Sequence, residues 1–183
     1  MKYTEAMNNI NAKGAEDRQE GDLYYTPNAL ARQLISIIPL KKGQTVLDPA
    51  KGYGAFFNNY PEGVKASWCE ISEGLCFYKN KESYDWLVTN PPFSNLKKWL
   101  IKSCNISRVG FAYVIPSHGL TENRIRACAE FGFNITNLIY FKNPPQWGLG
   151  FQMVWVVWQK TKAGNVKTLN HPNTRQTNLE GFE

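Results

Sequence analysis

Short apolar runs recur along most of the chain, and their alternation with helix-like segments limits the fold more than any other feature. The runs lie at 44–50, 64–71, 75–79, 84–90, 107–116, 134–141 and 151–160. Apolar residues at helical spacing appear between some of them, at 94–104 and 121–131. Strands that alternate with helices form parallel sheets, so the sequence predicts an α/β fold. The last two runs are joined by a loop alone, which allows an antiparallel pair there.

A further helix is predicted ahead of the first strand. In TPNALARQLISIIPL, Leu30, Leu34 and Ile38 recur at helical spacing. Thr26 is a favoured N-cap residue, and Pro27 would then occupy the first helical position, where no N–H is needed. These signals predict a helix that begins directly after Thr26.

The length of the chain, 183 residues, suits a single domain with a substantial core. We predict that domain at 23–162, between a polar N-terminal segment at 1–22 and a polar tail at 163–183. Neither an apolar run of about 18 residues nor the apolar centre of a signal peptide appears. We therefore expect a cytoplasmic protein without membrane contact.

Basic side chains gather in one part of the sequence. The formal net charge is +6, and residues 91–120 contain Lys97, Lys98, Lys102 and Arg108 but no acidic residue. Such a stretch is typical of a solvated helix face or of a surface that binds a polyanion. The four cysteines are scattered and only two histidines are present, so no metal site is predicted.

A glycine-containing loop follows the first predicted strand. In LDPAKGYGAFF (47–57), Gly52 and Gly54 let the backbone approach a ligand closely, and Asp48 adds an acceptor at the strand end. Glu70 ends the next strand, where an acidic side chain can accept both hydroxyls of a ribose. The loop is neither a phosphate loop nor a GxGxxG motif. Together, the loop and Glu70 favour a site for a nucleoside-containing cofactor without a pyrophosphate. The alternative interpretation is a plain glycine-rich turn followed by a surface glutamate.

The sequence TNPPFSN stands behind another strand. Pro91 and Pro92 end a strand because neither carries an N–H for the ladder. A plain strand end, however, would need neither Asn90 nor Phe93.

Four motifs resemble, in the same order, those of amino-group DNA methyltransferases, which use S-adenosylmethionine. They are YYTP (24–27), LDPAKGYGAF (47–56), CEI (69–71) and TNPPF (89–93). The resemblance covers residues 23–160 and is strongest to small adenine-specific members from bacteria and phages. It implies a Rossmann-like class I methyltransferase fold in a bacterial or phage-infected cell. The seven strands of that fold have the order 3-2-1-4-5-7-6, with strand 7 antiparallel and helices on both faces.

The resemblance also implies roles for individual residues. The implied catalytic residues are Asn90, Pro91, Pro92 and Phe93. The implied cofactor-binding residues are Tyr24, Thr26, Pro27, Asp48, Pro49, Ala50, Gly52, Gly54, Glu70, Cys76, Phe77 and Asn90. Cys76 departs from the family, which usually has an acid there to accept a hydrogen bond from the cofactor's adenine. A thiol is a weak acceptor, so reduced cofactor affinity or lost activity is expected as an alternative.

The chemistry of the implied reaction explains the motif. The exocyclic amine of adenine is a poor nucleophile, because its lone pair is delocalised into the ring. The Asn90 side-chain oxygen and the Pro91 carbonyl would accept its hydrogens, and the prolines would hold both acceptors in place. Phe93 would stack against a base flipped out of duplex DNA.

DNA is the expected partner, and Lys97, Lys98, Lys102, Arg108 and His118 are candidates for contact with it. Three other functions remain open: an RNA adenine methylase, a degenerate non-catalytic nucleic-acid-binding subunit, and a protein glutamine methylase, since related motifs occur in RNA and glutamine methylases. No separate recognition domain fits in the chain, so a partner subunit is an alternative reader of the target sequence.

A second Asn–Pro–Pro stretch, at 143–145, is interpreted as a loop well away from the cofactor crevice. Trp147, with Gly148 and Gly150, is either a flexible wall near the flipped base or a plug against the core.

Overall fold

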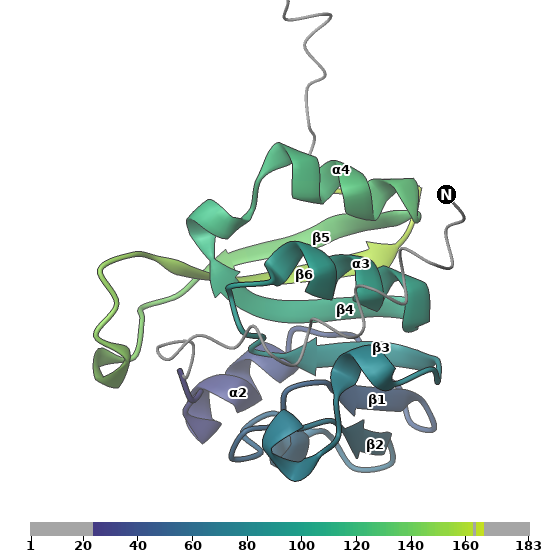
Figure 1. The fold of residues 1–183 in the computed structure, drawn as a ribbon, viewed down its shortest axis with the longest axis horizontal. Coiled ribbons are helices and arrows are strands. Elements are labelled where there is room, and N and C mark those ends of the chain that lie inside the picture. Colours follow the sequence, from purple (N-terminus) through teal and green to yellow (C-terminus); the bar gives the residue numbers. More distant parts are fainter. Residues whose placement is uncertain (1–23, 163, 167–183) are drawn as a thin grey trace, which may run out of the picture.

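The computed structural model describes residues 24–162 and 164–166 (Figure 1). The predicted N-terminal segment at 1–22 and most of the predicted tail, including His171, lie outside the described residues. Within the described residues, the strands are β1 (Thr45–Asp48), β2 (Lys65–Trp68), β3 (Tyr84–Thr89), β4 (Ser107–Pro116), β5 (Phe133–Tyr140) and β6 (Met153–Lys160). They form one sheet of six strands in the order β2-β1-β3-β4-β6-β5.

The sheet is mixed, with β6 running against its neighbours. Strands β1, β2, β3 and β4 pair in parallel. β6 lies between β4 and β5 and is antiparallel to both, so the predicted antiparallel pair at the end of the chain is confirmed. The strand order and directions agree with the predicted order 3-2-1-4-5-7-6, except that the strand numbered 3 there is absent from the described sheet.

The prediction of a seventh strand at 75–79 is wrong. Residues Phe77–Lys79 form a single 3-10 turn, η3, instead of a strand. The Phe77 ring stacks on Trp99, with ring centroids 4.5 Å apart, and is almost fully buried. Burial of this ring against a helix therefore decides the local structure, although its strand propensity is high.

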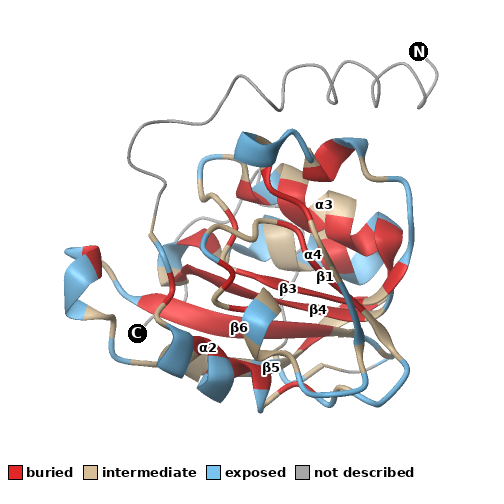
Figure 2. Cartoon of the chain, turned by 90° about the horizontal axis from the view of Figure 1, so that it is seen from below, coloured by how far each residue is buried: buried red, intermediate tan, exposed pale blue. Residues whose placement is uncertain are grey.

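Helices cover both faces of the sheet (Figure 2). α2 (Asn28–Ile35) lies on one face, and α3 (Leu96–Ile106) and α4 (Glu122–Glu130) lie on the other. Alternate residues of a strand point to opposite faces. Trp86 therefore packs in the core that contains Leu34 of α2, and Leu87 in the core that contains Trp99 of α3.

The first helix begins one residue later than the cap signal predicts. Pro27 is the N-cap of α2, and no side chain caps the helix. The Thr26 hydroxyl instead accepts a hydrogen bond from the Asn90 side chain, 3.2 Å away. A potential helix cap is thus used to hold a residue at the end of β3.

The remaining described elements are single 3-10 turns: η1 (Phe57–Asn59), η2 (Ile71–Glu73), η4 (Ser117–Gly119) and η5 (Pro145–Trp147). The short described part of the predicted tail continues the domain, because the Asn165 amide donates to the Ile135 carbonyl at 2.8 Å. No helix of the described residues is long and apolar enough to span a membrane.

Candidate cofactor and substrate site

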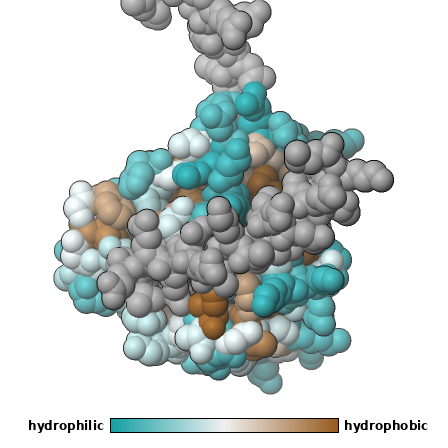
Figure 3. All heavy atoms as spheres, in the orientation of Figure 1, coloured by the Kyte–Doolittle hydropathy of each residue, from teal (hydrophilic) through white to brown (hydrophobic). Residues whose placement is uncertain are grey.

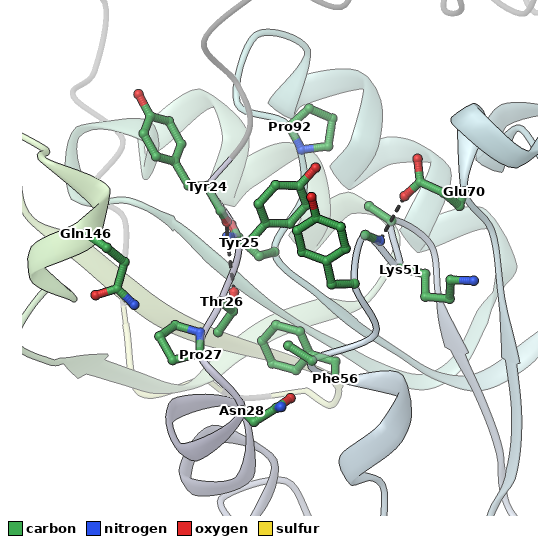
Figure 4. A pocket seen from close by; sticks show the side chains of 15 residues that line it. Tyr24, Tyr25, Thr26, Pro27, Asn28, Lys51, Phe56, Glu70, Pro92 and Gln146 are labelled. Atoms are coloured by element: carbon green, nitrogen blue, oxygen red, sulfur yellow. Dashed lines mark hydrogen bonds between the residues drawn. The ribbon is translucent and has the colours of Figure 1, made fainter.

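The predicted motifs meet where the parallel strands end. β1 and β3 are neighbours, so the loops that follow them emerge side by side, and the segment before α2 lies against both. A cavity of about 390 Å³ opens between these three segments (Figure 4). Its wall consists of Tyr24, Tyr25, Thr26, Pro27, Asn28, Ala50, Lys51, Gly52, Tyr53, Ala55, Phe56, Glu70, Asn90, Pro92 and Gln146.

A smaller cavity of about 50 Å³ adjoins the first. Ala50, Glu70 and Pro92 line both cavities. The rest of its wall is Pro49, Ile71, Phe77, Tyr78, Ser94, Asn95 and Trp99. Cys76 and Gly54 line neither cavity, although both were predicted to contact the cofactor.

The Asn90 side chain is held in one orientation. Its Nδ2 atom donates to the Tyr24 carbonyl at 2.7 Å and to the Thr26 hydroxyl at 3.2 Å. A backbone carbonyl can only accept, so the amide nitrogen must face Tyr24. The Oδ1 atom is buried and has no hydrogen-bond partner among the described residues. A buried acceptor without a partner is rare in native proteins, which makes this atom a candidate for ligand binding.

Glu70 forms the wall that the cavities share. Its side chain is buried, Oε2 accepts from the Gly52 amide at 2.8 Å, and Oε1 accepts from the Ser72 amide at 3.2 Å. Gly52 has a φ of +51°, and a Cβ there would come within 3.2 Å of the Tyr25 ring. Glycine therefore allows the loop both to bond Glu70 and to pass under Tyr25.

Asp48 is not among the residues that line either cavity, and its predicted role in cofactor binding stays a prediction. The side chain is fully buried, and Oδ1 accepts from the Thr89 hydroxyl at 2.7 Å and from the Ala50 amide at 3.3 Å. Burial raises the pKa of Asp48 to about 7. Asp48 thus joins the first loop to the residue that precedes Asn90.

Two aromatic pairs stand at the cavity. Tyr24 and Phe93 stack with ring centroids 5.7 Å apart and planes 11° from parallel. Tyr25 and Tyr53 stack at 4.0 Å, and Tyr53 is 80% exposed. The site therefore presents flat apolar faces next to the Asn90 acceptor.

Gln146 and Trp147 belong to this site, so the prediction that the second Asn–Pro–Pro stretch lies far from the crevice is wrong. Gln146 lines the larger cavity, and Trp147 Nε1 donates to the Tyr25 carbonyl at 2.8 Å. The signal for this position was the topology. β5 runs in the same direction as β4, so the connection after β5 emerges at the same edge of the sheet as the NPPF motif.

Three of the predicted basic residues lie close to the site. Lys97, Lys98 and Lys102, together with Arg124, line a third cavity of about 410 Å³ beside α3. This cavity shares Tyr78, Ser94 and Asn95 with the smaller one. Lys97 is exposed, whereas Lys102 donates to the Asn80 carbonyl at 2.5 Å and burial lowers its pKa.

The other two predicted contact residues lie elsewhere. Arg108 stands at the start of β4, at the opposite edge of the sheet, and pairs with Asp85 at 3.0 Å. Arg108 therefore does not line the cavity that contains Lys97, Lys98 and Lys102, and its predicted contact with DNA stays a prediction. His118 is exposed in η4, and its ring meets the edge of Phe151 with centroids 5.1 Å apart, outside both cofactor-sized cavities. Among the described residues, no three His, Cys, Asp or Glu side chains are grouped to hold a metal ion.

Comparisons with known proteins agree with this geometry. The family model of the N-6 DNA Methylase family matches residues 5–83, which include YYTP, LDPAKGYGAF and CEI but end before TNPPF. A search of curated proteins gave no significant match.

Solved structures with the same fold come from several methyltransferases. A modification subunit of a putative type I restriction enzyme from Vibrio vulnificus aligns at a TM-score of 0.61 and 17% identity, over 86% of this chain and 48% of that one. The chain therefore spans about half of that subunit. Magnesium protoporphyrin IX methyltransferase from Synechocystis, solved with bound S-adenosylmethionine, aligns at 0.56 and 12% identity, over 86% and 96%. A putative RNA methyltransferase from Pyrococcus horikoshii aligns at 0.55 and 18%, over 88% and 100%.

These structural likenesses show the Rossmann-like methyltransferase fold. Residues 5–83, somewhat less than half of the chain, are similar in sequence to the N-6 DNA Methylase family.

Proposed function

We propose that the protein transfers a methyl group from S-adenosylmethionine to the exocyclic amine of adenine in DNA. The observation that carries this proposal is the Asn90 amide. Its nitrogen is held by Tyr24 and Thr26, while its oxygen is buried without a partner at the end of β3. An acceptor fixed in this way is suited to an amine hydrogen.

The chain's own residues would prepare the amine for attack. The Asn90 oxygen and the Pro91 carbonyl accept its two hydrogens, which draws the lone pair out of conjugation with the ring. Because both acceptors are fixed beforehand, no reorganisation is needed during the reaction. Bound S-adenosylmethionine would supply the electrophilic methyl group. The amine loses its proton after transfer, so no side chain of matched pKa is required.

The two adjoining cavities would receive the two ends of this cofactor. Tyr24, Thr26 and Pro27 line the larger cavity and would hold the methionine end. Glu70, in the shared wall, would accept hydrogen bonds from the ribose hydroxyls. Phe77 lines the smaller cavity and would contact the adenine there. The loop that contains Ala50 and Gly52 would lie beneath the cofactor, between its two ends.

DNA would lie over the α3 side of the site. Lys97 and Lys98 stand near the start of α3, directly after the NPPF motif, and would neutralise phosphates. The stacked Tyr24 and Phe93 rings would receive a flipped adenine. Sequence recognition would come from the loops at this edge or from a partner subunit.

The first test is incubation with tritiated S-adenosylmethionine and either duplex DNA or RNA, followed by digestion and separation of the nucleosides. We expect label in N6-methyladenine from DNA, its loss in Asn90→Ala, and its retention in Asn137→Ala. Asn137 is exposed on β5 and provides the matched control. Label in RNA alone would assign the activity to RNA. No label in either substrate, with intact cofactor binding by calorimetry, would indicate a non-catalytic subunit.

A further inference from the structure

Gln146 brings a second side-chain amide to the cavity that contains Asn90. It reaches the cavity from the β5–β6 connection (residues 141–152), whereas Asn90 follows β3. In Figure 4 its side chain extends from that connection towards Pro27. Gln146 is exposed and lines the cavity wall, so its amide is accessible to a ligand in the cavity.

The loop that contains Gln146 is held by neighbouring residues. The adjacent Trp147 is buried and donates to the Tyr25 carbonyl at 2.8 Å. Asn143 donates to the Phe151 carbonyl at 2.6 Å and accepts from the Met153 amide at 3.1 Å, which closes the base of the connection. This connection projects at one side of the molecule in Figure 1, with apolar atoms at its surface in Figure 3. The loop is thus held by hydrogen bonds at Asn143 and at Trp147, and Gln146 lies between these two residues.

A methylase that forms hydrogen bonds only with the exocyclic amine cannot distinguish adenine from another base that carries such an amine. Adenine and cytosine both carry an amine next to a ring acceptor, and the Asn90 oxygen and Pro91 carbonyl would accept hydrogens from either. Discrimination needs a donor aimed at N7, on the other side of the amine, where adenine has an acceptor and cytosine has a C–H. A glutamine amide is suited to adenine because it can donate to N7.

Resting on the proposed function, we propose that Gln146 is a specificity-determining residue, which donates a hydrogen bond from its amide to N7 of the flipped adenine. Asn90 then activates the amine and Gln146 identifies the ring. The two amides approach from separate connections, so neither alone defines the target base.

The inference is tested with base analogues. The target adenine is located by sequencing DNA methylated by the wild type, and duplexes then carry adenine, 1-deazaadenine or 7-deazaadenine at that position. Single-turnover rates are compared for the wild type, Gln146→Ala and Gln33→Ala. Gln33, exposed on α2 and absent from the cavity wall, is the matched control.

We expect the wild type to lose about 10- to 100-fold in rate on 7-deazaadenine but not on 1-deazaadenine, because the Gln146 donor is left without its acceptor. Gln146→Ala should lose a similar factor on adenine but little more on 7-deazaadenine, because the contact is already absent. An unchanged Gln146→Ala rate on adenine, or losses that multiply on both analogues, would overturn the inference. Weaker cofactor binding in Gln146→Ala, with normal rates at saturation, would also overturn it by placing the amide on the cofactor.

A second measurement does not require turnover. Binding of fluorescent single-stranded oligo(dA) is compared by anisotropy with the two deaza oligonucleotides, in the presence of S-adenosylhomocysteine. The wild type should discriminate against 7-deazaadenine, and Gln146→Ala against neither analogue. A wild type that binds all three equally overturns the inference. Absence of any adenine methylation, by contrast, is a failure of the proposed function.

Discussion

The same tripeptide, Asn–Pro–Pro, occurs twice in this chain with opposite hydrogen bonding. At 90–92 the asparagine nitrogen is bonded to Tyr24 and Thr26, and the oxygen is buried without a partner among the described residues. At 143–145 both ends of the amide are bonded, the nitrogen to the Phe151 carbonyl and the oxygen to the Met153 amide.

This difference shows that the tripeptide does not carry the chemistry by itself. An asparagine can act on a ligand only if its amide keeps an atom without a hydrogen-bond partner in the folded protein. Both amide atoms of Asn143 are bonded, so this residue stabilises a loop. Asn90 keeps one acceptor, its side-chain oxygen, for a substrate. Substitutions in the two stretches should therefore affect different properties of the protein.

The largest effect is expected from Asn90→Ala. Removing one pre-organised group that contacts the reacting atoms should lower kcat by about 10²- to 10³-fold, by analogy with oxyanion-hole donors. The free energy of unfolding should change by about 1 kcal/mol, because only the bonds to Tyr24 and Thr26 are lost. Single-turnover methylation and urea denaturation, measured on the same preparation, check both. A stability loss as large as the activity loss would remove the contrast with Asn143.

pH should separate the two stretches. Thr89, next to Asn90, is bonded to Asp48, whereas the hydrogen-bond partners of Asn143 do not titrate. Burial raises the pKa of Asp48 from its ordinary value of 3.8 to about 7. Between these values the folded protein keeps a proton that the unfolded chain releases. Stability from this group is therefore full below pH 3.8 and falls as the pH rises to about 7, by a few kcal/mol in order of magnitude.

Asp48→Asn keeps the shape and cannot ionise, so it should abolish that pH dependence and exceed the wild type in stability at alkaline pH. Urea denaturation of both proteins at intervals between pH 5 and pH 8 provides the measurement. If the free energies of unfolding of the two proteins changed in parallel with pH, the pH dependence would not come from Asp48.

The third effect is expected from Asn143→Ala. Both bonded ends of this amide are lost, which should cost about 1–3 kcal/mol and lower Tm by several degrees. Cofactor affinity, measured by calorimetry at low temperature, should stay close to that of the wild type. A protein with unchanged Tm but weakened cofactor binding would place Asn143 in the site instead.

The smallest effect is expected from Thr26→Val, which removes one of the two acceptors that hold the Asn90 amide. The shorter bond to the Tyr24 carbonyl remains, so the amide keeps its orientation. We expect a decrease in kcat of less than about tenfold, equivalent to a single neutral hydrogen bond. A decrease equal to that of Asn90→Ala would show that the hydroxyl, and not the carbonyl, fixes the amide.

Local sequence signals predicted most of the fold. Apolar runs located the six strands, and the short connection between the last two indicated their antiparallel pairing. The exception, Phe77, has a side chain that suits a strand, but its ring is buried against Trp99 of α3. That contact depends on the position of a helix far along the chain, which no local pattern reveals.

The site was predictable in its motifs but not in its contacts. The Tyr24 carbonyl that orients Asn90 lies 66 residues away in sequence, so the oriented amide was visible only in the structure. The ion pair between Arg108 and Asp85 was not visible in the sequence, because it depends on the pairing of β3 with β4. The position of Gln146 in the cavity wall was not predicted, because it depends on the direction of β5. That direction brings the connection after β5 to the same end of the sheet as the NPPF motif.

The central place of β6 has a consequence for biosynthesis. β6 is the last of the described strands in the sequence, yet it pairs with both β4 and β5, and its residues from Met153 to Trp158 are fully buried. A nascent chain that lacks these residues would leave the apolar edge of β4 open to other chains. The sheet can therefore close only after the ribosome has released residue 160, and we expect ribosome-stalled shorter chains to depend on chaperones for solubility.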